Sequence, residues 1–434
     1  MRRANSNTSL KDVAPILEEI KLDLISENHV EENVAKRKEI SRTFISDTVT
    51  VPSQDMYEYA VRATLGDDVY FDPSTAHLEA HMAKITGKEA GSLRHIWNRF
   101  QPDCTPHPPT ATTVFRSSRP EVTYQQVSRT LSAIVNVWLE SKTLINRYEA
   151  GGTAFHSGAH LITVQPSNKH HLTLEDIKDN ISLTTDIHFA PTTVVALENT
   201  LNGTIFPQEE IERISEYVHS VPGLKLHLDG ARIWHVAVET NTPLKELCEP
   251  FDSVSLCFSK GLGAPVGSCL VGSKEFIAKA RWFRKLFGGG MRQTGFLAAS
   301  AAYALTHNLP QLVRVHDLTR RLQNGLEEIG CRILSRAETC MIFYDPGPVG
   351  VTYEEIAERG SSLPEPLVLG GSRLVVHIQT SEEAVNDFLN IVRTLAAEKK
   401  AAGFVAPDPN SYGAFLKDIY VRRAAKFPGV KKDN

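Results

Sequence analysis

The sequence predicts an α/β protein: a large domain with a mostly parallel sheet covered by helices, followed by a small α+β domain. Three observations support this. Between Tyr148 and about Leu305, strand-like apolar runs alternate with segments of helical spacing. Beyond that point, a long helical stretch leads into short apolar runs and a further helix. The chain has 434 residues, which is enough for two domains.

The predicted elements of the large domain follow one another in a regular order. "TTVVALENT" (192–200) predicts a buried strand that ends in polar residues. The next segment, 209–221, has helical spacing, and "LKLHLDGAR" (224–232) predicts a strand that ends in charge. "SVSLCFSKGLGAPVGSCLVG" (253–272) predicts two short strands around a glycine turn. Strands that alternate with helices are typical of a parallel sheet.

Composition changes along the chain suggest where its parts begin and end. Residues 1–43 are polar and mixed in charge, and we interpret them as an N-terminal extension. The large domain is predicted over 44–305 and the small domain over 306–398. The tail, 399–434, is rich in Lys, Arg, Pro and Gly and is expected to be loosely attached. Inside the large domain, 92–147 has no clear periodicity.

The overall composition excludes several classes of protein. Hydrophobic residues make up 41% and charged residues 23% of the chain, the balance of a soluble globular protein. A formal net charge of -4 gives no reason to expect a nucleic-acid or membrane partner. The six cysteines form no CxxC pair, so we expect reduced thiols, no metal site and a cytoplasmic location.

Asp229 follows the apolar alternation of "LHLDGARIW", where the predicted strand ends. Ligands of open α/β sheets bind at the carboxyl ends of strands, so a carboxylate here could pair with a protonated pyridine nitrogen. The alternative is an ordinary helix N-cap, a position that Asp favours.

Lys260 occupies the corresponding position after the next apolar strand, before Gly261 and Gly263. A lysine at a strand end among small residues can be desolvated and form a Schiff base with a carbonyl cofactor. The alternative is a solvated lysine in a hairpin turn. The glycine spacing does not match a Walker phosphate-binding loop.

Together, Asp229 and Lys260 match the needs of pyridoxal 5'-phosphate: a carboxylate for the ring nitrogen and an amine for the aldehyde. Segments in the same order resemble the low-specificity L-threonine aldolase family of aromatic amino acid beta-eliminating lyases. The resemblance covers roughly 46–89 and 148–398. It rests on "SDTVTVPSQDM", "LGDDVYFDPSTAHLE", "IHFAPTTVVALENT", "LHLDGARI", "SKGLGAPVGSCLVG" and "FGGGMRQTGFLAA".

The resemblance implies roles for individual residues. Lys260 resembles the lysine that binds the cofactor, Asp229 the partner of its ring nitrogen, and Arg232 a contact of its phenolic oxygen or of the substrate carboxylate. Arg373 in "GSRLVVH" resembles the arginine that holds that carboxylate, and Ser46 in "ISDTVT" the serine that also contacts it.

His188 in "IHF" resembles the histidine near the substrate's β-hydroxyl, where it would act as a base directly or through water. Each of these assignments has an alternative. Arg373 could be a surface arginine, His188 a core histidine, and Ser46 a plain helix cap.

The family likeness also implies a fold and an activity. The fold would be that of fold-type-I pyridoxal-phosphate-dependent transferases, with a seven-stranded sheet. The reaction would be the retro-aldol cleavage of L-threonine or L-allo-threonine to glycine and acetaldehyde. By analogy, we expect a small β-hydroxy amino acid as substrate and a homodimer or homotetramer. The alternatives are an alanine racemase on the same scaffold and a catalytically impaired relative.

Residues 92–147 depart from the family pattern. Relatives have a phosphate-binding turn after "GKEA", but this chain continues "GSLRHIWNRF". A one-nucleotide shift of the reading frame permits Leu-Phe-Val-Thr-Ser-Gly-Thr from Ser92 onward, although the genetic code forces only the glycine. We hypothesise a misread frame or a retained intron, and we assign no site residue to this segment.

Overall fold

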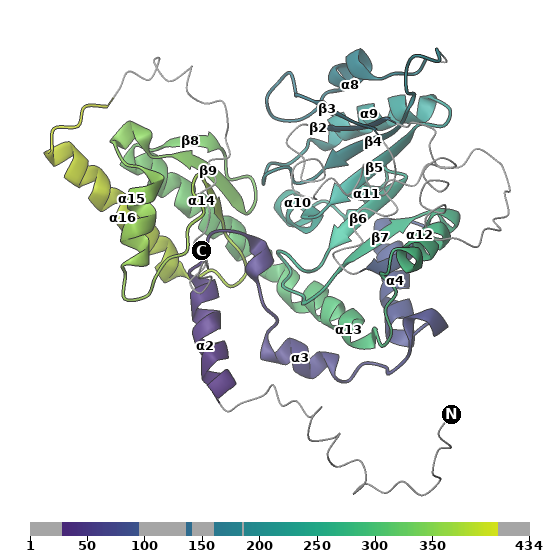
Figure 1. Ribbon diagram of the computed structural model, residues 1–434, viewed down its shortest axis with the longest axis horizontal. Helices are drawn as coiled ribbons and strands as arrows, with labels where there is room; N and C mark the ends of the chain where they lie inside the picture. The colour runs from purple at the N-terminus through teal and green to yellow at the C-terminus, as the bar shows by residue number, and fades with distance from the viewer. Residues whose placement is uncertain (1–27, 95–135, 141–159, 185, 407–434) are drawn as a thin grey trace, which may run out of the picture.

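The computed structural model describes residues 28–94, 136–140, 160–184 and 186–406, which form two lobes, each with its own sheet (Figure 1). Most of the aperiodic segment 92–147 therefore lies outside the described residues. Among the described residues, no helix combines the length and the apolar character needed to cross a membrane.

The larger lobe is built on a seven-stranded sheet in the order β1-β7-β6-β5-β4-β2-β3. Strands β3, β2, β4, β5 and β6 pair in parallel, whereas β7 is antiparallel to both β6 and β1. The predicted fold class, with a mostly parallel seven-stranded sheet, is confirmed. The strands are β1 (Ala90–Arg94), β2 (Asn136–Glu140), β3 (His160–Val164), β4 (Thr192–Glu198), β5 (Lys225–Gly230), β6 (Ser253–Cys257) and β7 (Ser268–Gly272).

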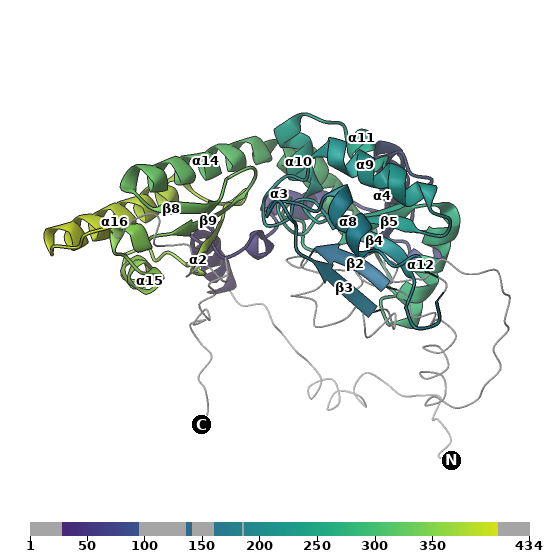
Figure 2. The ribbon, with the colours of Figure 1, turned by 90° about the horizontal axis from the view of Figure 1, so that it is seen from above.

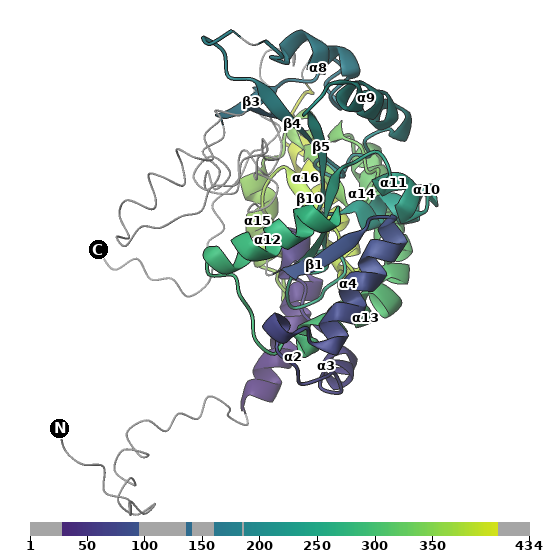
Figure 3. The same cartoon turned by 90° about the vertical axis from the view of Figure 1, so that its right-hand side faces the viewer.

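Helices cover this sheet on both faces. Figure 3 shows α4, α9 and α11 on one side of the sheet and α12 on the other. The spacing that predicted a helix over 209–221 buries Ile211, Ile214 and Val218 on the sheet side of α9. The helices of this lobe are α3 (Gln54–Ala60), α4 (Pro73–Thr86), α8 (Leu174–Asn180), α9 (Gln208–Ser220), α10 (Ile233–Thr240), α11 (Leu244–Cys248), α12 (Lys274–Leu286) and α13 (Gly295–Tyr303).

The centre of the sheet is the core of the molecule. Every residue of β6 and β7 is buried, and β5 is buried from Leu226 onward. Parallel strands covered on both faces have this pattern, because neither face meets water. The polar residues at the ends of these strands therefore lie next to a buried apolar core.

The smaller lobe contains a three-stranded antiparallel sheet in the order β10-β9-β8. Its long helix α14 extends toward α10 of the larger lobe (Figure 2). The elements are α14 (Leu312–Ile329), β8 (Arg332–Ser335), β9 (Met341–Asp345), α15 (Tyr353–Ser361), β10 (Arg373–Val375) and α16 (Glu382–Ala401).

The N-terminal segment contacts this smaller lobe. Helix α2 (Asn28–Ser41) is followed by a bridge in which the Phe44 amide donates to the Val368 carbonyl at 2.9 Å. Arg42 pairs with Asp387 at 2.6 Å. The last part of the predicted extension 1–43 is thus held against the small lobe, and the domain boundaries themselves remain predictions.

The close contact of α3 and α4 with α13 gives a test of packing. A Cβ added at Gly295 would lie 2.2 Å from the backbone carbonyl oxygen of Thr64, so the helix would have to move. We expect Gly295→Ala to lower the free energy of unfolding by roughly 1–3 kcal/mol, as overpacked cores do. Gly370→Ala is the control, because its Cβ would meet only ordinary contacts at 3.8 Å and beyond. Equal thermal midpoints for the two variants would contradict this packing.

Candidate functional site

Asp229 and Lys260 lie at the same edge of the large sheet. Asp229 is the last residue but one of β5 and pairs in register with Ser255 of β6. Lys260 follows β6 by three residues. Their exposed fractions are only 1% and 6%. The carboxyl ends of neighbouring parallel strands thus bring together the two residues that the sequence singled out.

The loop that carries Lys260 is fixed by its backbone. The Lys260 carbonyl accepts hydrogen bonds from Thr50 Oγ1 at 3.0 Å and from the Gly263 amide at 2.9 Å. Gly263 has a φ of +68°, which glycine adopts without steric cost. The glycine turn predicted from the sequence therefore orients the lysine.

Polar atoms at this edge fit a polar ligand. One Asp229 oxygen, Oδ1, accepts from the Ala231 amide at 3.0 Å. In the described part of the chain, Asp229 Oδ2, Thr200 Oγ1 and Ser259 Oγ are buried without a hydrogen-bond partner. Asp229 lies at the end of β5, and Thr200 and Ser259 each follow the end of their strand, β4 and β6, by two residues. Buried polar atoms are normally paired. The residues present therefore fit pyridoxal phosphate, with Asp229 at the ring nitrogen and Lys260 as the amine.

Arg232 forms a buried ion pair that the sequence did not predict. Its Nε and Nη2 donate to the two carboxylate oxygens of Asp47 at 2.8 and 2.6 Å. Burial alone would raise the pKa of the Asp47 carboxyl, but Arg232 and the charge of Lys260 hold it well below its ordinary 3.8. Asp47 directly follows Ser46 in "ISDTVT", and that motif was the only signal for it.

The segment around Asp47 brings the predicted substrate-binding residues together. Ser46 caps a short 3-10 turn (Asp47–Val49) by accepting from the Thr48 amide at 3.2 Å. Arg373, at the start of β10, donates to the Ile45 carbonyl at 2.8 Å. Ser46, Arg232 and Arg373 therefore meet along three consecutive residues, between the two lobes.

His188 is not brought to this group. Its side chain is 79% exposed and pairs with Asp186 at 2.7 Å. It precedes β4, whose far end, Glu198, is the partner of Asp229 in the sheet. A strand of seven residues separates the two ends by about 20 Å. The structure of this chain does not place His188 near Lys260, and its role as a base stays a prediction.

Two further buried groups adjoin Asp47. His235 of α10 and Cys340, just before β9, each offer an atom within 4.8 Å of one Asp47 oxygen and of each other. Burial and the neighbouring His316 lower the pKa of His235 to about 3, and burial raises the pKa of Cys340 to about 12. Both groups are therefore neutral at neutral pH. Arg232 already balances the carboxylate, so this cluster is not assigned to a metal ion.

Comparison with known proteins identifies the fold and the family. The fold is that of the fold-type-I class of pyridoxal-phosphate-dependent enzymes. The chain belongs to the beta-eliminating lyase family, whose model matches residues 43–98 and 124–346. The match is interrupted over 99–123, inside the segment that lacks periodicity.

Individual relatives cover most of the chain. A probable low-specificity L-threonine aldolase of Schizosaccharomyces pombe is 35% identical over 381 residues, 87% of this chain and 93% of that protein. An alanine racemase of Cochliobolus carbonum is 35% identical over 357 residues, 80% and 86% of the two chains. The structure of Leishmania major threonine aldolase superposes with a TM-score of 0.65 at 17% identity, covering 82% and 99%.

The buried His235 makes stability depend on pH. The unfolded chain binds a proton at the ordinary histidine pKa of 6.5, whereas the folded chain does so only near 3. The contribution of neutral His235 to the free energy of unfolding is thus complete above pH 6.5. It is lost as the pH falls toward 3, at about 1.4 kcal/mol per pH unit. The ionised Asp47 carboxylate also contributes to the free energy of unfolding, and that contribution is lost only at a lower pH, below the ordinary aspartate pKa of 3.8.

We therefore expect His235→Asn to flatten the pH dependence of the free energy of unfolding in the His235 window. Chemical denaturation at a series of pH values measures it. His29→Asn, which alters a 46% exposed histidine of α2, is the matched control. An unchanged slope in His235→Asn would show that the ring is charged in the folded chain.

Proposed function

We propose that the chain is a pyridoxal-phosphate-dependent L-threonine aldolase that cleaves L-threonine and L-allo-threonine to glycine and acetaldehyde. The observation that carries the proposal is the pair of buried groups at the carboxyl edge, Asp229 on β5 and Lys260 after β6. Relatives that share 35–38% of their residues with this chain over most of its length are named low-specificity L-threonine aldolases. The cofactor, when bound, supplies the electron sink that a retro-aldol cleavage needs.

The residues of the chain divide the remaining tasks. Asp229 would stabilise the positive charge of the ring nitrogen through Oδ2. Lys260 would supply the amine that holds the cofactor. The apolar strands beneath them exclude water, which strengthens both interactions.

Arg373 is the main candidate for the substrate carboxylate. Arg232 donates to Asp47 through two nitrogens, and Arg373, at the start of β10, donates to the carbonyl of Ile45, the residue before Ser46. A guanidinium can bind a carboxylate through two parallel hydrogen bonds. Arg232 then serves mainly to fix the Asp47 segment from below.

The alanine racemase relative keeps a second reaction open for the same scaffold. Racemisation would need Lys260 and Asp229 just as cleavage does. Incubation with threonine and with alanine, followed by chiral analysis of the amino acids and assay of acetaldehyde, separates the two. Acetaldehyde from threonine without exchange of alanine enantiomers supports the aldolase.

We also propose that the chain acts in the cytoplasm as a homodimer or homotetramer. Around α3 and the loop after it, large apolar side chains are exposed: Val61 (68%), Leu65 (89%), Tyr70 (79%) and Phe71 (72%). Contiguous exposed apolar patches mark interaction surfaces. Light scattering on the purified chain measures the oligomeric state, and a monomer would refute this part.

Replacement of Lys260 gives the central test of the proposal. We expect Lys260→Ala to abolish the long-wavelength absorbance of the bound cofactor and to lower the cleavage rate by about 10⁴-fold or more, because the covalent anchor is lost. Absorbance spectra and an acetaldehyde assay measure the two effects. Lys274→Ala, at the exposed start of α12, is the control. A cofactor spectrum that survives in Lys260→Ala would refute the assignment.

Arg373 offers a separate test of substrate binding. A lysine cannot reproduce the two parallel hydrogen bonds of a guanidinium, so Arg373→Lys should raise KM for threonine by roughly tenfold or more with the cofactor spectrum retained. Arg393→Lys on α16, away from the site, controls for the loss of an arginine. A KM equal to that of the unaltered chain would move the carboxylate site elsewhere.

A further inference from the structure

A chain of titratable side chains leads from the site to the surface. His235 Nδ1 lies 2.9 Å from His316 Nε2, and His316 Nδ1 lies 2.6 Å from Glu239 Oε2. His235 and Glu239 are one turn apart on α10, and His316 comes from α14 of the small lobe. Both histidines are 1% exposed, whereas the Glu239 side chain is 28% exposed.

The hydrogen bonds of this chain have one consistent direction. The Glu239 carboxylate can only accept, so His316 Nδ1 carries the proton. In a neutral ring, His316 Nε2 is then an acceptor, and His235 Nδ1 must donate to it. This leaves His235 Nε2 with a lone pair and no proton.

That lone pair faces the lysine loop. His235 Nε2 is buried and, within the described residues, has no hydrogen-bond partner. It lies 2.5 Å from the position that a Cβ on Gly261 would take, and Gly261 directly follows Lys260. Only a glycine at position 261 leaves room for the His235 ring.

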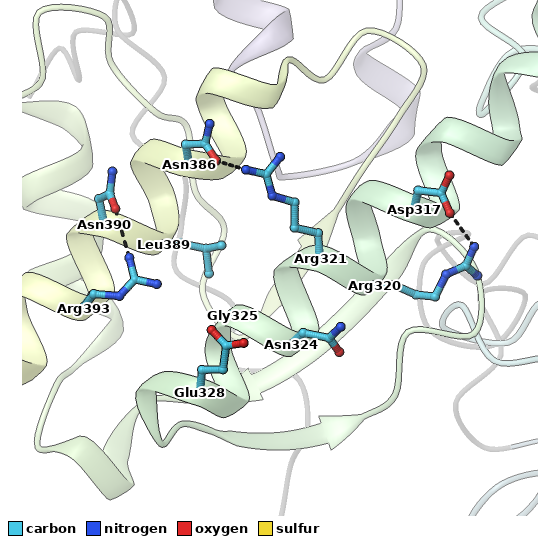
Figure 4. A pocket seen from close by; sticks show the side chains of 10 residues that line it. All are labelled: Asp317, Arg320, Arg321, Asn324, Gly325, Glu328, Asn386, Leu389, Asn390 and Arg393. Atoms are coloured by element: carbon cyan, nitrogen blue, oxygen red, sulfur yellow. Dashed lines mark hydrogen bonds and ion pairs between the residues drawn. The ribbon is translucent and has the colours of Figure 1, made fainter.

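The outer end of the chain reaches solvent. Glu239 Oε1 accepts from Arg320 at 2.8 Å, and Arg320 also pairs with Asp317. Arg320 and Asp317 line an open groove of about 840 Å³ between α14 and α16, shown in Figure 4. The relay thus ends beside a wide, polar, water-accessible surface.

We propose that His235, His316 and Glu239 form a proton relay. It exchanges protons between the solvent and the buried charged groups Asp47, Arg232 and Lys260. A proton released by the Lys260 amine and taken up at His235 Nε2 is matched by transfer of the Nδ1 proton to His316 Nε2. The Nδ1 proton of His316 then passes to Glu239, which releases it to water. Each ring ends in its other neutral tautomer, and one proton has left the site.

The electrostatics of the surrounding groups keep both rings neutral, as such a relay requires. Burial lowers the pKa of His316 and of His235, despite the carboxylates of Glu239, Asp317 and Asp47. The cations that face them are Arg232 at the inner end and Arg320 at the outer end. Neutral imidazoles can both accept and donate, whereas an imidazolium could only donate.

The relay rests on the proposed function for its purpose. A lysine that is alternately bound to the cofactor and released must lose and regain protons inside a site from which water is excluded. His188 is exposed, and the described structure does not place it where it could do this. His235, His316 and Glu239 carry protons to and from the loop that holds Lys260, against which His235 Nε2 packs at Gly261.

The test uses a jump of the loaded full-length protein from neutral to alkaline pH, followed through the absorbance of the bound cofactor. Glu239→Gln keeps the size of the side chain and a hydrogen-bond acceptor but cannot carry the proton. We expect this variant to slow the absorbance relaxation by roughly tenfold or more, with an unchanged final spectrum. Glu328→Gln, the same substitution at a residue that lines the groove but lies outside the relay, should relax like the unaltered chain. Equal rates for all three proteins would overturn the relay.

A second measurement does not depend on the cofactor. Nitrogen-15 spectra of histidine-labelled full-length protein report which ring nitrogen carries the proton, and His235→Asn and His316→Asn assign the signals. We expect two neutral rings protonated on Nδ1. A proton on Nε2 of either ring, or an imidazolium at neutral pH, would overturn the relay. Absence of a cofactor band with these tautomers present would refute the proposed function alone.

Discussion

The buried ion pair between Asp47 and Arg232 is the interaction on which the site depends. A buried pair contributes little net stability, because desolvation offsets much of the attraction, but loss of one partner leaves a buried charge and costs roughly 3–5 kcal/mol. Its main effect is therefore positional. With Arg232 holding Asp47, the Ile45 carbonyl is placed to accept from Arg373, and the Thr50 hydroxyl is placed to donate to the Lys260 carbonyl. One short segment thereby places groups from both lobes around the end of the sheet.

Much of this arrangement could be predicted from the sequence. The predictable parts depend on local sequence pattern, whereas the others depend on contacts between distant residues. The strands around Asp229 and Lys260 are short, apolar and followed by polar residues, so local pattern placed them and the sheet rule put their ends together. The Asp47–Arg232 contact joins residues 185 positions apart, and His235–His316 joins helices of different lobes. No local pattern encodes such pairings. The assignment of His188 relied on motif likeness alone, and in this chain its side chain is exposed.

The segment 92–147 shows where motif likeness ends. The family match stops at 98 and resumes at 124, so a stretch within this segment has no counterpart in the family model. The stretches that hold Asp229, Lys260 and Arg232 lie outside this segment and within the matched part of the chain. The residues assigned to the cofactor's ring and amine therefore come from a part of the chain that the family model matches without interruption.

The pairing of Phe44 with Val368 has a consequence for the order of assembly. The segment around Phe44 is synthesised long before its partners, because Ile45 and Arg373 are 328 positions apart. During synthesis the sheet that carries Asp229 and Lys260 can form before Val368 and Arg373 are available to contact Phe44 and Ile45. The contacts between the two ends of this arrangement form only after Arg373 has been made, so a chain that stops before this residue lacks them.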